Sequence, residues 1–162
     1  MRRLLVALLL VGSASAAIAD VSESDVRWNR IAGVITAINV DNPVGNVHAG
    51  TFPCTASGGR ARVNLHSGYT TFDVFGLVIN GTIFAGTPGP VTGVIGTLVC
   101  DPGDATESTV DTPEVSLSAQ GEAHFVGHLD GIPNSCTNPA SLLRTSTPPG
   151  ARGFWIANGT ER

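Results

Sequence analysis

The chain has 162 residues, with nine arginines, no lysine and 13 acidic residues, and its formal net charge is −4 at pH 7. No run of basic residues follows the arginine pair near the N-terminus. The sequence therefore lacks the charge pattern of a protein that binds nucleic acid or an anionic membrane surface.

The first 19 residues have the order of a secretory signal peptide. Two arginines precede an apolar run over residues 4–11, and residues 17–19 (Ala-Ile-Ala) match the small-x-small cleavage pattern. The apolar run is shorter than the roughly 20 residues that a membrane span requires. We therefore predict a signal peptide over residues 1–19, with cleavage after Ala16 as a second option. We also predict a secreted, periplasmic or cell-envelope protein with one domain over residues 20–162.

Turn residues divide the rest of the chain into short β-branched and aromatic runs. The 20 glycines and ten prolines occur at intervals typical of β-sandwiches and barrels. In chain order, strands are predicted over residues 31–40, 45–52, 59–65, 69–79, 91–100, 114–120, 122–129 and 153–159. Residues 140–145 fit either a strand or one helical turn, and the acidic, proline-bounded segment 101–114 is predicted to be a loop.

Two pairs of neighbouring runs are typical of β-hairpins. The clearer pair is 59–65 with 69–79, because Ala61, Val63 and Leu65 alternate with polar residues. The second is 114–120 with 122–129. No run repeats apolar residues at helical spacing, so we predict an all-β fold of eight or nine strands. An antiparallel two-sheet sandwich fits best, with a closed β-barrel as the alternative.

Three segments resemble small exported bacterial β-proteins of no assigned function. They are FDVFGLVINGT (72–82), GTPGPVTGVIGTLVCDPG (86–103) and VSLSAQGEAHFVGHL (115–129). The resemblance covers the last two-thirds of the chain that follows the signal peptide. It implies an exported β-domain and identifies no active-site residue.

The three cysteines allow one intramolecular disulfide. In an exported protein a bridge is expected, and no Cys-x-x-Cys pair suggests redox or zinc-ribbon chemistry. We predict that Cys100 pairs with Cys136, since each follows a strand and precedes a loop. Cys54 would then be free, buried or able to pair between molecules. A bridge between Cys54 and Cys100 is the alternative.

His124 and His128 are the residues most suggestive of chemistry. On a helix their spacing suits zinc, but on a strand they lie roughly 13 Å apart, too far for one ion. Glu122 with His124 could share an ion only if His48 or His66 joined them from another strand. The sequence therefore predicts a solvated sheet face and no transition-metal site.

The segment 101–111 offers hard oxygen ligands to calcium. Asp101, Asp104, Glu107 and Asp111 carry carboxylates, but their spacing does not match the twelve-residue calcium loop. A solvated loop is the simpler interpretation, and calcium remains an alternative cofactor.

No assembled catalytic motif is present in the sequence. It has no Gly-x-Ser-x-Gly elbow, His-Glu-x-x-His helix or phosphate-binding glycine loop. We therefore expect a non-catalytic domain that binds a protein or glycan partner or has a structural role outside the cell. The alternative is a small secreted metal-dependent or hydrolytic enzyme. A pocket that gathers the histidines with a carboxylate would favour the enzyme, and scattered histidines would favour binding.

Overall fold

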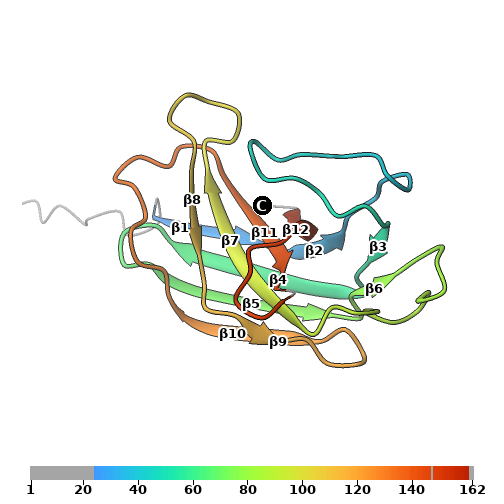
Figure 1. The fold of residues 1–162 in the computed structure, drawn as a ribbon. Coiled ribbons are helices and arrows are strands. Elements are labelled where there is room, and N and C mark those ends of the chain that lie inside the picture. The colour runs from blue at the N-terminus through green and yellow to red at the C-terminus, as the bar shows by residue number, and fades with distance from the viewer. Residues whose placement is uncertain (1–23, 147, 161–162) are drawn as a thin grey trace, which may run out of the picture.

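A computed structural model describes residues 24–146 and 148–160, and all regular structure in these ranges is β (Figure 1). The predicted signal peptide, residues 1–19, lies outside the described residues. The strands of the described ranges are β1 (Asp25–Trp28), β2 (Arg30–Gly33), β3 (Cys54–Thr55), β4 (Gly58–Asn64), β5 (Tyr69–Phe75), β6 (Val78–Ile79), β7 (Gly93–Cys100), β8 (Ser108–Asp111), β9 (Val115–Ser116), β10 (Ala123–His128), β11 (Pro139–Thr145) and β12 (Trp155–Thr160). The prediction of an all-β fold is confirmed.

Two larger antiparallel sheets form most of the domain. The smaller has the strand order β1-β4-β5-β10, and the larger has the order β2-β12-β11-β7-β8 with β9 also paired to β7. Only Asn29 separates β1 from β2, so the chain passes from one sheet into the other at that residue. In Figure 1, β4 and β5 run across the direction of β7 and β8. The result is a sandwich-like single domain with a curled, half-barrel outline.

The core lies between the two sheets. Phe72 on β5 stacks on Phe125 of β10 with ring centroids 5.7 Å apart, and Phe125 is only 8% exposed. Gly96 on β7 faces this pair, since a Cβ atom built there would lie 2.7 Å from the Phe72 ring. The sheets therefore approach closely where β7 crosses β5. The remaining core is aliphatic, with Ile31, Val74, Leu98 and Leu142 among its most buried side chains.

The clearer hairpin is confirmed. β4 and β5 pair antiparallel with Val63 opposite Thr70, and Ala61 and Val63 are buried as their alternation predicts. β5 is shorter than expected, because Gly76 takes a left-handed conformation with φ 58° and ends it. β6 then forms a separate two-stranded sheet with β3.

The second hairpin prediction is wrong. β9 pairs with β7, and β10 pairs with β5. A hydrogen bond of 2.9 Å from Ser118 N to Glu122 O closes the connection, but the two strands belong to different sheets. Alternation fixes which face of a strand is buried and carries no information on its partner.

Four further expectations need correction or completion. The predicted strand over residues 31–40 ends at Gly33, and Ile35 beyond it is 87% exposed. Residues 45–52 form only isolated bridges, such as Ala49 with Trp155. The predicted loop 101–114 contains β8, because Val110 is buried opposite Leu98 of β7. The ambiguous segment 140–145 lies in strand β11.

Candidate functional site

The four histidines lie in three parts of the molecule: His124 and His128 on β10, His48 in the loop between β2 and β3, and His66 in the β4–β5 turn. His124 Nδ1 pairs with Asp73 Oδ1 on the neighbouring strand at 2.5 Å, and the His128 ring meets Tyr69 edge-on at 5.6 Å. His48 pairs with Asp41 within one loop. Among residues 24–146 and 148–160, no group of three or more His, Cys, Asp or Glu residues is arranged to hold a metal ion.

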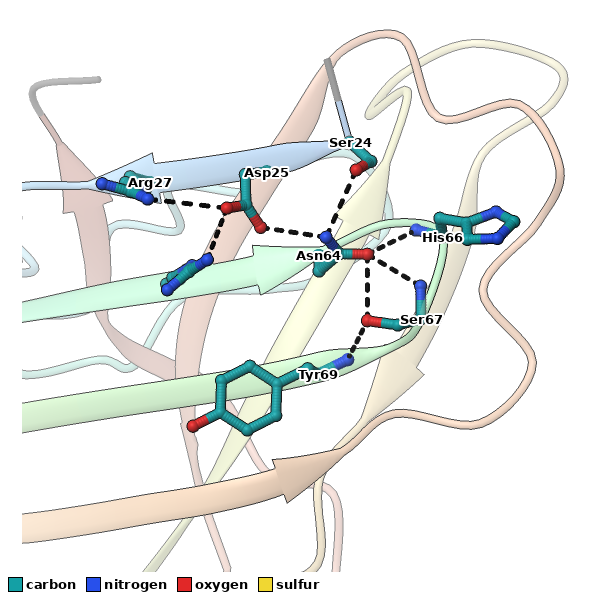
Figure 2. Close-up of polar contacts among 8 residues, drawn as sticks. Ser24, Asp25, Arg27, Asn64, His66, Ser67 and Tyr69 are labelled. Atoms are coloured by element: carbon teal, nitrogen blue, oxygen red, sulfur yellow. Dashed lines mark hydrogen bonds and ion pairs between the residues drawn. The ribbon is translucent and has the colours of Figure 1, made fainter. Parts of the chain in front are cut away.

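His66 belongs to the β4–β5 turn, where Asn64 organises the chain. Asn64 Oδ1 accepts hydrogen bonds from the backbone N–H groups of His66 and Ser67 and from the Ser67 hydroxyl. Figure 2 shows the His66 ring directed away from these contacts. Asn64 also donates through Nδ2 to Ser24 and Asp25 at the start of β1. This polar cluster fixes a turn and joins it to the edge strand.

Glu122 and His124 are not joined by a third predicted ligand. Glu122 stands just before β10, where its backbone N–H donates to Ser118 Oγ at 3.0 Å. His48 lies in the loop between β2 and β3, and His66 lies in the β4–β5 turn. The side chains of His124 and His128 project from one continuous strand, so the spacing argument against a shared ion applies to the fold as observed.

The outward side chains of β1, β4, β5 and β10 form what we call the polar face. They are Asp25, Arg27, Arg60, Arg62, Asn64, Tyr69, Thr71, Asp73, Phe75, His124, Val126 and His128. The opposite faces of the same strands carry Trp28, Val63, Phe72 and Phe125, which are buried. One sheet therefore has an apolar inner side and a mostly polar outer side, as the alternation predicts.

Two aspartates organise the charges of the polar face. Hydrogen bonds from Arg62 and then Asn64 hold the pKa of Asp25 below its usual value. Partial burial raises the pKa of Asp73, but hydrogen bonds from His124 and Arg60 outweigh it, and the net shift is downward. Both carboxylates are therefore ionised at neutral pH.

Two of the four acidic residues considered for calcium, Asp101 and Glu107, direct their carboxylates at protein donors. Asp101 accepts from Thr137 and Asn138, and these bonds lower its pKa. Glu107 accepts from the backbone N–H groups of Asn46 and Gly103, each at 2.7 Å. The calcium alternative stays a prediction.

The structure contains the predicted disulfide. Cys100 and Cys136 are bonded, with Cα atoms 4.9 Å apart, within the usual range. The bridge is compatible with an oxidising compartment. Cys54 is free and buried, and burial raises the pKa of its thiol to about 11. The Cys54 thiol is therefore protonated at neutral pH and acts as part of an apolar wall.

That wall belongs to an apolar pocket of about 140 Å³ at the end of the sandwich that holds β3 and β6. In Figure 1 this end carries the long loops that flank those two strands. Its lining includes Phe52, Cys54, Leu77, Ile79, Phe84 and Phe154. The three phenylalanines are 41%, 40% and 52% exposed, respectively. Sequence reasoning missed this pocket, because its lining residues come from separate parts of the chain.

We call the pocket and the loops that flank β3 and β6 the apolar end. Phe52, Phe84 and Phe154 are exposed in the pocket lining, and the flanking loops also carry the exposed side chains of Ile35, Ile38, Val40 and Ile83. The residues from Ile35 to Phe52 lie in the loop between β2 and β3, and Ile83 and Phe84 follow β6. No helix in the described parts of the chain is long and apolar enough to cross a membrane.

The chain matches no protein-family model, and comparisons with curated proteins and with solved structures give no significant match. Function is therefore inferred from the geometry of the described residues.

Proposed function

We propose that the protein is an exported, non-catalytic binding domain that receives an apolar side chain of a protein partner in the pocket of the apolar end. The observation that carries this proposal is the exposure of three of the six phenylalanines around one pocket. The signal-peptide pattern and a disulfide support export of the domain.

The size of the pocket favours one side chain over a whole small molecule. Sites for drug-sized ligands usually measure about 300–1,000 Å³, whereas this pocket measures about 140 Å³. An engineered apolar cavity of about 150 Å³ in another protein accepts a benzene ring. A phenylalanine, leucine or isoleucine side chain therefore fits, and such anchors in small pockets dominate many protein interfaces.

The loops that flank the pocket carry further exposed apolar side chains. Ile35 and Ile83 are 87% and 93% exposed, although burying such side chains would gain about 1.5–3 kcal/mol each. Exposed apolar patches of this kind commonly mark interaction sites. A protein partner would cover the patch while one of its side chains fills the pocket.

The experiment is a titration followed by amide NMR, with N-acetylphenylalaninamide as a mimic of the anchoring side chain. We expect shifts of the amide signals of Thr51, Phe52 and Ile79, which line the pocket. N-acetylalaninamide is the control ligand, because its methyl side chain buries too little area to bind. Equal shifts with both compounds, or shifts confined to the polar face, would contradict the proposal.

Matched variants separate the pocket from general surface hydrophobicity. Phe84→Ser with Phe154→Ser removes two rings of the rim and should abolish the shifts. Val126→Ser removes an apolar side chain of similar exposure, 54%, from the polar face, and should leave the shifts unchanged. Retained binding in the double variant would show that the rim does not contribute.

A further inference from the structure

The polar face carries three of the chain's nine arginines beside two aspartates. Arg27, Arg60 and Arg62 line one hollow of about 440 Å³. Thr71, Asp73, His124 and Val126 form the side of the hollow that belongs to β5 and β10. The hollow is separate from the apolar pocket, and the two share no lining residue.

The strand register places the arginines next to one another. Arg27 on β1 lies directly opposite Arg62 on β4, and Arg60 lies two residues along β4 on the same side of the sheet. Like charges at directly opposed positions destabilise a sheet. Asp25, which pairs with both arginines, offsets part of this electrostatic cost, and a bound anion would offset more of it.

The two aspartates of the face satisfy only part of the arginine hydrogen-bonding capacity. Asp25 Oδ2 accepts from Arg62 and from Arg27, the latter at 3.5 Å. Asp73 accepts from Arg60 Nε at 3.0 Å. Each guanidinium carries five N–H donors. Arg62 Nε is buried and has no hydrogen-bond partner among the described residues.

The aspartates also hold the arginines in place. Asp73 accepts a hydrogen bond from Arg60 through Oδ2 and pairs with His124 through Oδ1. Both of its carboxylate oxygens therefore have partners that line the hollow. Arg27 and Arg60 remain 62% and 78% exposed, and their outer N–H groups are accessible from solvent. Such planar donors match the geometry of carboxylate and sulfate groups.

We propose that this hollow binds an oxyanion, a carboxylate or sulfate group, carried by a soluble acidic sugar. Its volume lies within the usual range for small-molecule sites and exceeds the space that a bare tetrahedral ion fills. The Thr71 hydroxyl and the Asn29 amide, which also line the hollow, can hydrogen-bond to sugar hydroxyl groups. Val126 offers an apolar surface to the ring.

The experiment is an amide NMR titration of the protein with glucuronate, inorganic sulfate and glucose in low salt. We expect glucuronate to shift the signals of Arg27, Arg62 and His124, and glucose to leave them unchanged. Sulfate should shift the same signals more weakly, because it makes only the oxyanion contacts. No shift with glucuronate, or shifts of equal size with glucose, would overturn the proposal.

Matched arginine variants locate the site. Arg60→Gln and Arg27→Gln should each weaken glucuronate binding about tenfold or more, the usual effect of losing a charged hydrogen bond. Arg152→Gln removes the same charge from an arginine that pairs with Asp111 away from the hollow, and should leave the affinity unchanged. An equal loss in all three variants would indicate net charge alone and overturn the site.

An experiment with lipid vesicles tests whether the oxyanion belongs to a soluble sugar or to a lipid headgroup. Co-sedimentation with phosphatidylglycerol vesicles that is lost in Arg60→Gln, without binding of glucuronate, would assign the hollow to lipid headgroups and reject a sugar. Binding of glucuronate without co-sedimentation supports the proposal. Neither outcome depends on the apolar end, so this site and the proposed function can fail independently.

Discussion

The polar face and the apolar end use side chains in opposite ways. On the polar face, charged groups stand on regular strands and pair with one another across the sheet, as Arg60 and His124 do with Asp73. At the apolar end, large apolar side chains stand on long loops, and Ile35 and Ile83 are almost fully exposed. The two-residue period of a strand explains why polar side chains gather on the polar face. The apolar end instead depends on how long loops fold back on the sheets.

This difference identifies which parts of the protein serve folding and which do not. Burial of one side of a strand is needed for the core, so the alternation that buries Phe125 also places His124 outside. Nothing in folding requires Phe84 or Phe154 to be half exposed beside a pocket. The proposed binding of a partner would give a physical reason for the apolar end, and regular strand geometry is sufficient for most of the polar face.

The largest expected loss of stability comes from a variant on the buried side of the sheet that carries the polar face. Phe125→Ala should lower the free energy of unfolding by about 3–5 kcal/mol, because the ring is buried against Phe72 and its loss leaves a cavity. Urea denaturation followed by tryptophan fluorescence measures the change. The matched control is Phe75→Ala on β5, where the ring is 48% exposed. A similar loss in both variants would contradict the assignment of the two sides.

The second prediction concerns the disulfide, which closes an interval of 36 residues. Replacing Cys100 and Cys136 by alanine should cost roughly 4 kcal/mol in the chain-entropy model. Urea curves of the double variant and of the reduced wild-type protein should agree within experimental error. A disulfide-linked peptide that contains Cys54 in the oxidised protein would contradict the pairing.

The sequence predicts where the strands lie better than it predicts which strands pair with each other. The alternation over Ala61 and Val63 fixes the inner side of β4, and the turn residues after it fix the pairing with β5. β10 shows the same alternation, but its partner is β5, which lies some 50 residues earlier in the chain. That pairing depends on long-range packing, which a local pattern cannot encode.

Loops account for most of the remaining errors. The run 31–40 is apolar on both sides and therefore fits a buried strand, yet the chain leaves the sheet after Gly33. Val34 N donates to Ile156 O and Val34 O accepts from Cys54 N, and Asn39 then turns the chain with φ 65°. The apolar residues beyond Val34 contribute to the apolar end, which is why a pattern that normally signals a core was misread.

The third prediction is that low pH removes the stabilising contribution of the two aspartates on the polar face. The pKa values of Asp25 and Asp73 are lowered in the folded protein, so their stabilising contribution is complete above the unfolded value of 3.8. It is lost as pH falls through the lower folded values. Asp25→Asn with Asp73→Asn should therefore be less stable than wild type at pH 7. The difference should begin to shrink below about pH 3.8 and should vanish once the pH lies below the folded values.

Urea midpoints at pH 7, 5, 4 and 3 measure this effect. Glu122→Gln, a change of the same kind on an exposed carboxylate next to β10, provides the control and should follow the wild-type curve. A constant difference between the double variant and wild type at every pH would show that the two carboxylates do not supply the acid sensitivity.

The smallest expected effects concern the two histidines of β10. His124 and His128 are exposed and lie roughly 13 Å apart along one strand, so neither supports the core and the pair cannot share an ion. His124→Ala and His128→Ala should each change the free energy of unfolding by no more than about 0.5 kcal/mol. Zinc should leave the urea midpoints of wild type and of both variants unchanged. A zinc-dependent rise in wild-type stability that disappears in either variant would show that the polar face holds a metal after all.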